Sequence, residues 1–565
     1  MSATESTTSI TTTTDTTLLL VSYDLWSLVL TFGVALIIFY VLKIIVNLRR
    51  NIAKGKDIPG YWQILNEGLV RIPILSPYIA HGNSDVVIRL MRQEQEKHKN
   101  DNDNSQQLCV RVTTPHRNNI IIADKDSVKE VLLTKASSFV KPVDAFYEPF
   151  NIFSKTASSI LTAPDGPVWK NHHVVVSPSF STNNLRYMCE SAIKATDALF
   201  KTKWEKLLDK SSETITVKGN RGEQKKGFVL DLEDYSDVTL AVIGEAGFGI
   251  DFGIFSETSN DGKKFREALT NVIKHDYYQR FFFGQGLVRK LLARYTETDK
   301  ALALMSEHLN RYISQRQEEF KQDPEKSLND LLSQLVKANM EELSNHKLTL
   351  DELKSNAYIF VIAGHETTST TLQWLMYELS KNQKAQEKAR EEALRIGGPE
   401  LRAPNFEDYA NMEYIHATMM ESLRLHPPVV SIVKECCKTT KVGKYTIPKG
   451  STMYLDAKAC HTLSPDFNNE TYKGTDFAPE RFLDKDFKQK VISSVSWFPF
   501  SGGNRKCIGY SFSQIETCMI LCRLLQFYEF TLLNDESKKE DVVVDVPGIT
   551  ARPSSNLRVL VTRRQ

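Results

Sequence analysis

The segment Phe500-Ser501-Gly502-Gly503-Asn504-Arg505-Lys506-Cys507-Ile508-Gly509 decides the interpretation of this chain. A glycine-rich turn lets the backbone approach a flat ligand closely, and the amphipathic pattern of residues 510–528 predicts a helix directly after it. The thiol of Cys507 would lie where unpaired N–H groups and the helix dipole lower a thiol pKa and favour metal ligation. Haem iron held by one cysteine suits such a site. In an isolated turn of this kind, a buried structural cysteine is the more common case.

A second motif lies inside a long helical pattern, residues 349–381, which opens on the capping box formed by Thr349 and Glu352. At about 1.5 Å per residue the helix would be roughly 50 Å long and would cross the whole domain. In its middle, Ala363-Gly364-His365-Glu366-Thr367-Thr368 interrupts an apolar run, and Ala363 and Thr367 share a face because they are four residues apart. An acid and two hydroxyls beside small residues indicate proton delivery. The alternative is that these are ordinary solvated helix residues.

Together these motifs resemble those of the cytochrome P450 family over roughly residues 65–560. The family pattern F-x-x-G-x-R-x-C-x-G is met in full by Phe500, Gly503, Arg505, Cys507 and Gly509. The resemblance implies that Cys507 is the proximal ligand to the iron of haem b, that Arg505 pairs with a haem propionate, and that Phe500 packs near the sulfur. It also implies a mainly α fold with minor β structure, forming a single large haem domain.

The long helix matches the family pattern (A/G)-G-x-(D/E)-T-(T/S). The resemblance implies that Glu366 and Thr367 deliver protons during oxygen activation and that Ala363 contacts the cofactor. His365 fills the variable position and is interpreted as a structural or solvent-facing residue.

Glu421-Ser422-Leu423-Arg424 and Pro479-Glu480-Arg481-Phe482 follow in the order that the family shows. An isolated i,i+3 pair of opposite charges is worth only about 0.2–0.5 kcal/mol on a solvated helix. The resemblance implies instead that Glu421, Arg424 and Arg481 form a buried structural network, in which truncating one partner costs about 3–5 kcal/mol.

Two positions depart from the family. The pattern W-x-x-x-R has His173 in place of the arginine after Trp169, and Lys434 stands where relatives often carry a propionate-binding arginine. The resemblance implies propionate contacts for Trp169, His173 and Lys434. Histidine is only partly charged near neutral pH, and lysine cannot form the two-pronged contact of arginine.

The N-terminal region predicts a membrane anchor. Residues 1–24 are rich in Ser and Thr, lack Lys and Arg, and are expected to be disordered, whereas residues 25–46 are apolar enough to span a bilayer. Residues 47–64 form a linker to the haem domain, residues 65–565. A cleaved signal peptide is the alternative, but here the basic residues follow the apolar run; they are Arg49, Arg50, Lys54 and Lys56. The positive-inside bias places everything after them in the cytosol.

Composition excludes several classes of protein. The 565 residues include 71 Lys+Arg and 69 Asp+Glu, a net charge of +2, and 41% are hydrophobic. This balance argues against a disordered chain and against a nucleic-acid partner. The eight cysteines include no C-x-x-C pair, which argues against a zinc module. Helical patterns at 184–208, 263–274, 290–321 and 349–381 dominate, with strand patterns at 108–112, 119–122 and 557–561.

The resemblance implies a monooxygenase of the endoplasmic reticulum membrane that acts on a small molecule. Because the chain has no G-x-G-x-x-G turn or flavin module of its own, it implies electrons from an NADPH-cytochrome P450 reductase. A haem-thiolate isomerase, dehydratase or binding protein that does not activate oxygen is the alternative. Candidates for a basic docking face are Arg505, Lys506, Lys434 and Lys438, although ordinary solvated lysines would account equally well for Lys434 and Lys438.

The substrate is not fixed by these motifs. Aromatic residues at 146–153 and 277–283 fall where the family covers its pocket and its entrance, and they would stack on a substrate or touch lipid, with lipid favoured. The Thr-rich start and overall pattern look like a fungal microsomal enzyme. Coupling of formyl-tyrosine into dityrosine for fungal spore walls is one candidate, and hydroxylation of fatty acids or alkanes is the other. Sterol demethylation fits less well, because Glu366-Thr367 stands where that group usually has His-Thr.

Overall fold

The structure is a computed structural model of the chain. It describes residues 14–62, 91, 108–143, 147–154, 156–210, 215–218, 224–256, 260–283, 287–326, 328–341, 345–534, 544–545 and 550–564. Phe146 and the side chains of Tyr277, Tyr278 and residues 281–283 lie outside this description, so the expected contacts of those aromatic residues stay predictions.

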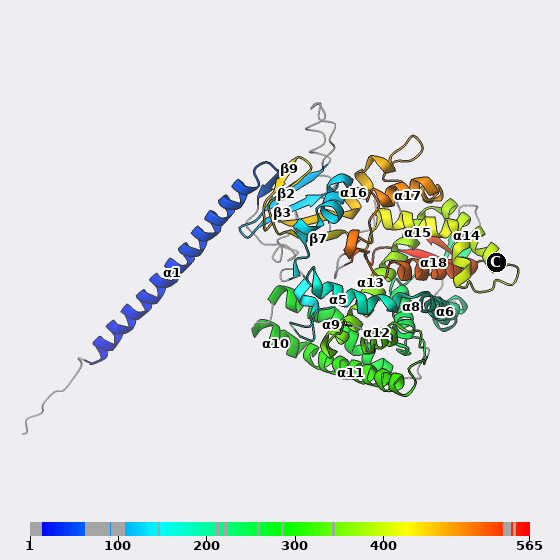
Figure 1. Cartoon of the computed structure of the whole chain (residues 1–565), viewed down its shortest axis with the longest axis horizontal. Coiled ribbons are helices and arrows are strands. Elements are labelled where there is room, and N and C mark those ends of the chain that lie inside the picture. The colour runs from blue at the N-terminus through cyan, green and yellow to red at the C-terminus, as the bar shows by residue number, and fades with distance from the viewer. Residues whose placement is uncertain are drawn as a thin grey trace, which may run out of the picture.

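The N-terminal part is one long helix, α1 (Thr14–Lys54), which projects from the body (Figure 1). Within its stretch Thr31–Lys54, an 18-residue window has a mean hydropathy of 2.2, so this part of the helix is long and apolar enough to cross a membrane. The helix begins before the predicted span and includes residues 14–24, which the sequence predicted to be disordered. At its other end the amide of Asn51 donates to the backbone of Thr114 at 3.1 Å. The expected linker, 47–64, therefore contains the end of α1 and the short strand β1 (Gly60–Trp62).

Helices form most of the body. They are α4 (Lys125–Lys129), α5 (Pro167–Val176), α6 (Thr182–Leu199), α7 (Glu205–Asp209), α8 (Glu233–Val242), α9 (Asn260–Phe283), α10 (Leu287–Tyr295), α11 (Thr298–Gln322), α12 (Leu331–Met340), α13 (Leu350–Lys381), α14 (Gln383–Gly397), α15 (Glu413–Leu425), α16 (Ala457–Leu463), α17 (Lys485–Ser493) and α18 (Tyr510–Phe527). The predicted helix 290–321 is divided into α10 and α11, since Glu297 takes a left-handed conformation with φ of 57°. The aromatic segment 277–283 is the last part of α9 rather than a loop.

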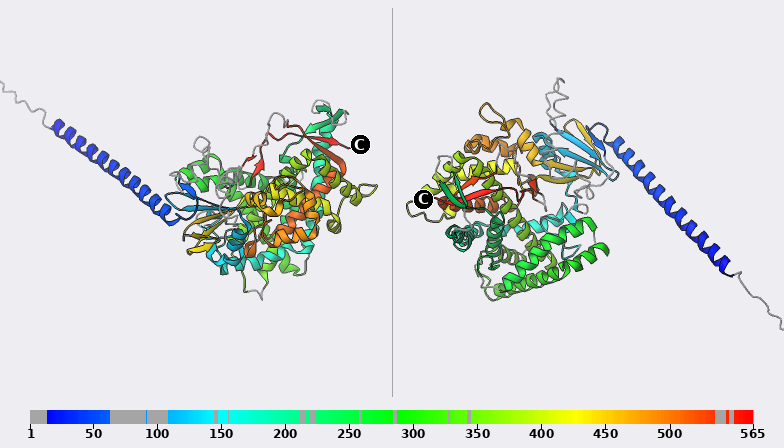
Figure 2. Two further views of the ribbon diagram at one scale, coloured as in Figure 1. Left: turned by 90° about the horizontal axis from the view of Figure 1, so that it is seen from above. Right: turned by 180° about the vertical axis from the view of Figure 1, so that it is seen from behind.

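The β structure is small, as expected. One sheet of six strands has the order β1, β2 (Cys109–Thr113), β3 (Asn118–Ile122), β10 (Thr452–Asp456), β7 (Ser431–Cys436) and β4 (Phe139–Val140). A second sheet has the order β11 (Tyr528–Leu532), β14 (Val559–Arg563), β6 (Gln224–Val229) and β5 (Ile215–Lys218). Two separate two-stranded sheets are formed by β8 (Thr440–Val442) with β9 (Tyr445–Ile447) and by β12 (Val544–Asp545) with β13 (Arg552–Pro553). Strands β2, β3 and β14 confirm the three strand predictions. Figures 1 and 2 show the six-stranded sheet at the end of the body from which α1 departs.

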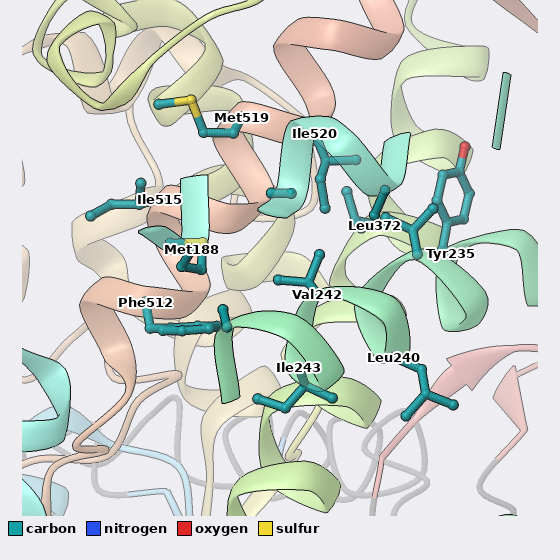
Figure 3. Packing of buried hydrophobic residues seen from close by; sticks show 14 of the residues in the cluster. Met188, Tyr235, Leu240, Val242, Ile243, Leu372, Phe512, Ile515, Met519 and Ile520 are labelled. Atoms are coloured by element: carbon teal, nitrogen blue, oxygen red, sulfur yellow. The ribbon is translucent and has the colours of Figure 1, made fainter. Parts of the chain in front are cut away.

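Helix α13 is the central element. The predicted capping box is present, because the Thr349 backbone N–H donates to the Glu352 carboxylate at 2.9 Å and the Glu352 N–H donates to the Thr349 hydroxyl. The helix is buried on both sides of its middle, at 353–362 and 368–376. Figure 3 shows part of the core around it, where side chains from α6, α8, α13 and α18 meet; examples are Met188, Val242, Leu372 and Ile520. This packing fixes the helix that carries the acid and hydroxyl motif.

Candidate active site

The cysteine loop is shaped by a glycine that no other residue could replace without strain. Gly503 has φ of 67°, and a Cβ added there would lie 2.5 Å from the carbonyl oxygen of Leu132. The backbone N–H of Cys507 donates to the carbonyl of Phe500 at 2.9 Å, which closes the loop. Helix α18 begins at Tyr510, so the thiol precedes a helix N-terminus as predicted.

The environment of the thiol differs from the expectation in one respect. Burial raises the pKa of Cys507, while the N–H of Gly509 and the charge of Lys506 lower it. Burial outweighs the helix terminus, so the predicted lowering of the pKa is wrong for the protein without a bound cation. Cys507 is nevertheless exposed to solvent. Its thiol is therefore accessible to a ligand.

The middle of α13 has the same property. Ala363 is exposed, and residues 364–367 are half-buried, although the helix is buried on either side. The hydroxyl of Thr367 donates to the carbonyl of Ala363 at 2.7 Å, so the two residues share a face as predicted. A Cβ on Gly364 would lie 3.1 Å from the side chain of Ile243, which follows α8, so the glycine allows this close packing. The motif therefore borders a space inside the protein.

Two contacts join the cysteine loop to this part of α13. The ring of Phe180, in the turn after α5, lies 5.7 Å from the ring of Phe360 and 6.5 Å from the ring of Phe512. A Cβ on Gly509 would meet the same ring at 3.4 Å. The hydroxyls of Thr368 and Ser513 lie 3.2 Å apart. The two motifs, far apart in sequence, thus lie on neighbouring elements.

A group of cations surrounds one carboxylate near the loop. The Nε of Arg505 donates to Asp165 at 2.6 Å, and its guanidinium lies 4.7 Å from the ring centroid of Trp169. The backbone N–H of Lys141 donates to the other oxygen of Asp165 at 2.7 Å. Burial lowers the pKa of Lys141 well below its ordinary value, and the charges of Arg505 and Lys434 lower it further. Burial also lowers the pKa of Lys434.

Arg505, Lys434 and Lys141 outnumber the one carboxylate, and such a basic group suits the propionates of a haem. The residues present therefore fit that group: a thiol and an exposed alanine border the space, and cations lie beside the loop. The role of Lys141 could not be predicted from the sequence, in which it is distinguished only by the proline that follows it. The direct propionate contacts expected of Arg505, Trp169 and Lys434 stay predictions. His173 lies 4.9 Å from the ring of Trp169, and its Nδ1 lies 3.2 Å from the hydroxyl of Ser177; its expected propionate contact also stays a prediction.

The acid of the motif is held by the C-terminal segment. The hydroxyl of Thr550 donates to the Glu366 carboxylate at 2.8 Å, and the hydroxyl of Thr370 lies 3.3 Å from that of Thr550. The sequence contains no signal for this contact, because the two residues are 184 positions apart. The Nδ1 of His365 lies 3.1 Å from the hydroxyl of Thr239 on α8, and burial lowers the pKa of His365 to about 4. His365 is therefore structural, which confirms the first of its two interpretations.

The predicted charge network is present and buried. Arg424 donates to both oxygens of Glu421, at 2.7 and 2.8 Å, and Arg481 donates to one of them at 3.3 Å. The Nδ1 of His461 lies 3.1 Å from the carbonyl of Arg424, and its Nε2 accepts the backbone N–H of Phe498 at 2.9 Å. Because Nε2 accepts, Nδ1 carries the proton. His461, which the sequence reasoning missed, joins the network to the segment before the cysteine loop.

The predicted docking face is partly wrong. The side chain of Lys434 is buried and that of Arg505 is only 11% exposed, since both belong to the cation group inside the protein. Lys506 and Lys438 are exposed, and the ammonium of Lys506 lies 3.7 Å from the ring centroid of Tyr510. Only these two of the four candidates can meet a partner.

The site has three parts: a cysteine loop, a cation group suited to propionates, and an acid and hydroxyl pair on a helix. Together they define the site of a haem-thiolate oxidoreductase. Residues 85–556 match the cytochrome P450 family, and the chain belongs to that family. Its members are monooxygenases that bind haem through a cysteine thiolate, and the mainly helical fold agrees with membership.

Similar proteins include named cytochromes P450 and a secologanin synthase. The chain is 28% identical to Cytochrome P450 CYP72A219 of Panax ginseng over 417 residues, which cover 73% of this chain and 74% of that one. It is 28% identical to Secologanin synthase 1 of Catharanthus roseus over 456 residues, 79% and 80% of the two chains. It is 27% identical to Cytochrome P450 3A12 of Canis lupus familiaris over 425 residues, 73% and 76%.

Proposed function

We propose that this chain is a membrane-anchored monooxygenase in which Cys507 holds the haem iron and an NADPH-cytochrome P450 reductase supplies electrons. The observation that carries the proposal is the exposed Ala363 face of α13, with Glu366 and Thr367, next to the cysteine loop. When bound, haem supplies an iron centre whose electron-rich sulfur ligand favours cleavage of the O–O bond. The absence of a dinucleotide motif in the sequence favours an external reductase.

The protein residues manage protons. The Thr367 hydroxyl is held by the carbonyl of Ala363, so its oxygen has lone pairs left to accept a proton as it gives up its own. Glu366 is held by Thr550 through one carboxylate oxygen, which leaves the other free to exchange protons. Arg505, Lys434 and Lys141 would orient the cofactor through its propionates. In this assignment Glu366 and Thr367 are the catalytic residues.

The alternative is a haem-thiolate protein that does not activate oxygen. Consumption of NADPH in the presence of reductase distinguishes the two, with wild type and Thr367→Ala compared. We expect Thr367→Ala to consume NADPH but to release more hydrogen peroxide and less product, because general acid catalysis contributes about 10²–10⁴-fold. Ser380→Ala is the matched control: this hydroxyl on the same helix donates only to the carbonyl of Tyr377. Equal product and peroxide in both variants would make the proton assignment wrong.

The membrane assignment is supported by two helices. Besides α1, helix α10 exposes apolar side chains that would contact lipid; Leu287, Val288, Leu291 and Tyr295 are 73, 51, 60 and 87% exposed. Lys290 and Arg294 are exposed on the same helix and suit anionic headgroups. Figures 1 and 2 show α10 on the side of the body toward which α1 projects. We propose that α1 spans the endoplasmic reticulum membrane and that the haem domain lies on its cytosolic side.

The chain contains a reporter for this orientation. Asn469-Glu470-Thr471 is a glycosylation acceptor, and Asn469 is exposed. We expect Asn469 to remain unmodified in cells, because glycosylation occurs on the luminal side. A second acceptor tripeptide placed within residues 1–13 should be modified. Glycosylation of Asn469 with the N-terminal acceptor left bare would reverse the proposed orientation.

The substrate class is suggested by a buried pair of arginines. The side chains of Arg280 and Arg289 are 9 and 8% exposed, and both bind Asp276, at 2.5 and 2.9 Å. Among the described residues, Arg289 alone of the two has a second carboxylate, the exposed Asp299 at 3.3 Å. Burial and then Asp276 raise the pKa of Tyr358 on α13, and the charges of Arg280 and Glu366 also act on it. Arg280 and Glu366 thus both act electrostatically on Tyr358, and we propose that the arginine pair favours a substrate with a carboxylate.

Formyl-tyrosine, coupled to dityrosine, and fatty acids, which are hydroxylated, carry such a group, whereas alkanes, the other candidate for hydroxylation, do not. Titrations followed by the spectral shift of the haem would compare formyl-tyrosine, its methyl ester, laurate and a sterol. We expect binding of an acid to weaken by at least about tenfold in Arg280→Gln, with a smaller change for the ester. If only the sterol binds, the substrate is a neutral lipid and the proposed carboxylate substrate is wrong.

A further inference from the structure

Helix α5 carries a buried histidine that the proposed function does not use. His172 is 0% exposed, and both of its ring nitrogens have polar partners on other segments. The Nδ1 lies 3.0 Å from the side-chain nitrogen of Asn356 on α13, and the Nε2 lies 3.1 Å from the hydroxyl of Ser158, which precedes α5. The Nε2 also lies 3.6 Å from the carboxylate of Glu352, the acid of the α13 capping box. His172 therefore joins α5 to α13 and to the segment before α5.

The hydrogen bonds around Asn356 determine which nitrogen of His172 carries the proton. The backbone N–H of Ile160 donates to the Asn356 Oδ1 at 2.8 Å, and the Asn356 Nδ2 donates to the carbonyl of Glu352 at 2.7 Å. Because Nδ2 is an amide donor, the Nδ1 of His172 accepts its second N–H, and the proton of the ring lies on Nε2. Burial lowers the pKa of His172, the Glu352 carboxylate opposes this change, and the charge of Arg505 lowers the pKa further. The ring is therefore a neutral donor at Nε2 and an acceptor at Nδ1.

The loop formed by residues 157–165 is fastened to α13 and α5 at its start. Ser158 and Ile160 make the two contacts described above. The hydroxyl of Ser355 on α13 adds a third contact, because it donates to the carbonyl of Ala157 at 3.1 Å. Three of the first four residues of the loop are thus held by side chains of the two helices.

The same loop holds the cysteine loop through Arg505. The Nη1 of Arg505 donates to the carbonyl of Ile160 at 3.3 Å, and the Nη2 donates to the carbonyl of Ala163 at 2.7 Å. The Nε donates to the Asp165 carboxylate at 2.6 Å. Ile160 is held from both sides, since its N–H donates to Asn356 and its carbonyl accepts from Arg505. The loop is therefore a bridge between α13 and the segment that carries the thiol.

We propose that His172 is a positioning residue of the cofactor site, because it fixes the loop 157–165 that holds Arg505 and Asp165 in place for the haem. A guanidinium has five N–H donors, and the loop takes three of them in the described part of the chain, so two remain for a propionate. Without His172, the loop would lose one contact and Asn356 would lose the acceptor for one N–H, so Arg505 would be held less firmly. This inference rests on the proposed function, since it assumes that haem binds at the cysteine loop.

The rate of haem release tests this role without turnover. The full-length holoprotein is mixed with excess apomyoglobin, and the transfer of haem is followed by absorbance. His172→Leu removes both hydrogen bonds of the ring, whereas His172→Gln keeps a donor and an acceptor. We expect release about tenfold faster in His172→Leu, as for the loss of one buried hydrogen bond, and a nearly wild-type rate in His172→Gln.

His346→Leu is the matched control. The Nδ1 of His346 lies 3.0 Å from the side-chain oxygen of Asn171, so this residue also connects α5 with the segment before α13, outside the loop 157–165. We expect wild-type haem release in this variant, and equal rates in His172→Leu and His346→Leu would overturn the proposal. If His172→Leu does not fold, Ser158→Ala takes its place, because it removes only the hydroxyl that accepts from Nε2. Release from Ser158→Ala no faster than from wild type would then overturn the proposal.

The reduction potential of the haem separates positioning from a general loss of stability. A cation held near the haem stabilises the electron that is added on reduction. We expect the potential to fall in His172→Leu and in Asn356→Leu, and to fall no further in the double variant, because both side chains act through the same loop. An unchanged potential in the single variants, or additive effects in the double variant, would overturn the proposal.

Cys507→Ala separates this inference from the proposed function. If Cys507→Ala loses the thiolate-haem spectrum while His172→Leu behaves like His346→Leu, only the positioning role is refuted. If Cys507→Ala keeps that spectrum, the proposed function fails as well.

Discussion

Arg424→Ala tests whether the buried charge network holds the domain together. The substitution removes two hydrogen bonds to Glu421, at 2.7 and 2.8 Å. It also removes three to backbone carbonyls, those of His461, Gly474 and Asp476, at 3.2, 2.5 and 2.9 Å. Both side chains of the ion pair are completely buried. Glu421 would keep Arg481 and the backbone N–H of Ala478 as partners.

The size of the effect follows from this geometry. Removing one partner from a buried ion pair costs about 3–5 kcal/mol, because the remaining charge is left in a medium of low dielectric constant. Because Glu421 keeps two partners, the expected loss of free energy of unfolding lies near the lower end of this range. The three backbone carbonyls that lose the arginine as a donor increase the loss. Since the total stability of a domain is about 5–15 kcal/mol, this single change removes a large part of it.

The assay is unfolding in urea followed by circular dichroism, together with the haem content of the purified protein. Lys321→Ala is the matched control: Lys321 and Glu318 have the same i,i+3 spacing at 2.6 Å but are each 62% exposed, so little change is expected. Arg424→Lys should also be destabilised, because lysine cannot bind both oxygens in a plane. If Arg424→Ala loses no more free energy of unfolding than Lys321→Ala, the reasoning about the network is refuted.

Three further predictions concern the cysteine loop and its supports. Burial lowers the pKa of His461 from 6.5 to about 3, so between these pH values only the unfolded chain takes up a proton there. The stability contributed by neutral His461 is therefore lost as the pH falls from about 6.5 towards 3. In His461→Gln, the free energy of unfolding should change less with pH over this range. Lys141→Met should lower the haem content per protein, measured after dialysis against apomyoglobin, while Lys438→Met should not. Gly503→Ala should prevent haem binding, because its Cβ would lie 2.5 Å from the Leu132 carbonyl; a normal thiolate-haem spectrum in that variant would contradict the strain argument.

The sequence predicted those parts of the site that follow local patterns. The cysteine loop, the α13 motif with its capping box and the pair Glu421 and Arg424 each lie within one turn or helix, so spacing alone placed their residues on a common face. Burial was harder to predict. Lys434 was a candidate both for a propionate contact and for the docking face, and Cys507 was expected to have the lowered pKa of a helix-terminus thiol. Desolvation by the surrounding elements dominates the pKa of both.

The remaining site residues depend on contacts between distant segments. Lys141 reaches the group around Asp165 from the end of β4, and Thr550 reaches Glu366 from the C-terminal segment. Neither contact leaves a periodic pattern in the sequence, because each is set by how the sheets and helices pack. The start of α1 was missed for the opposite reason: Ser and Thr have weak helix propensity, so composition indicated disorder where the backbone continues as a helix.

The hydrogen bond between Thr550 and Glu366 has a consequence for synthesis of the protein. A ribosome makes α13 long before it makes the C-terminal segment, and domains fold as their last elements emerge. The Glu366 carboxylate therefore lacks this hydrogen bond until nearly the entire polypeptide has been translated. A chain that ends before residue 550 would carry Glu366 without this hydrogen bond, and, like Thr367→Ala, it should release more peroxide and less product.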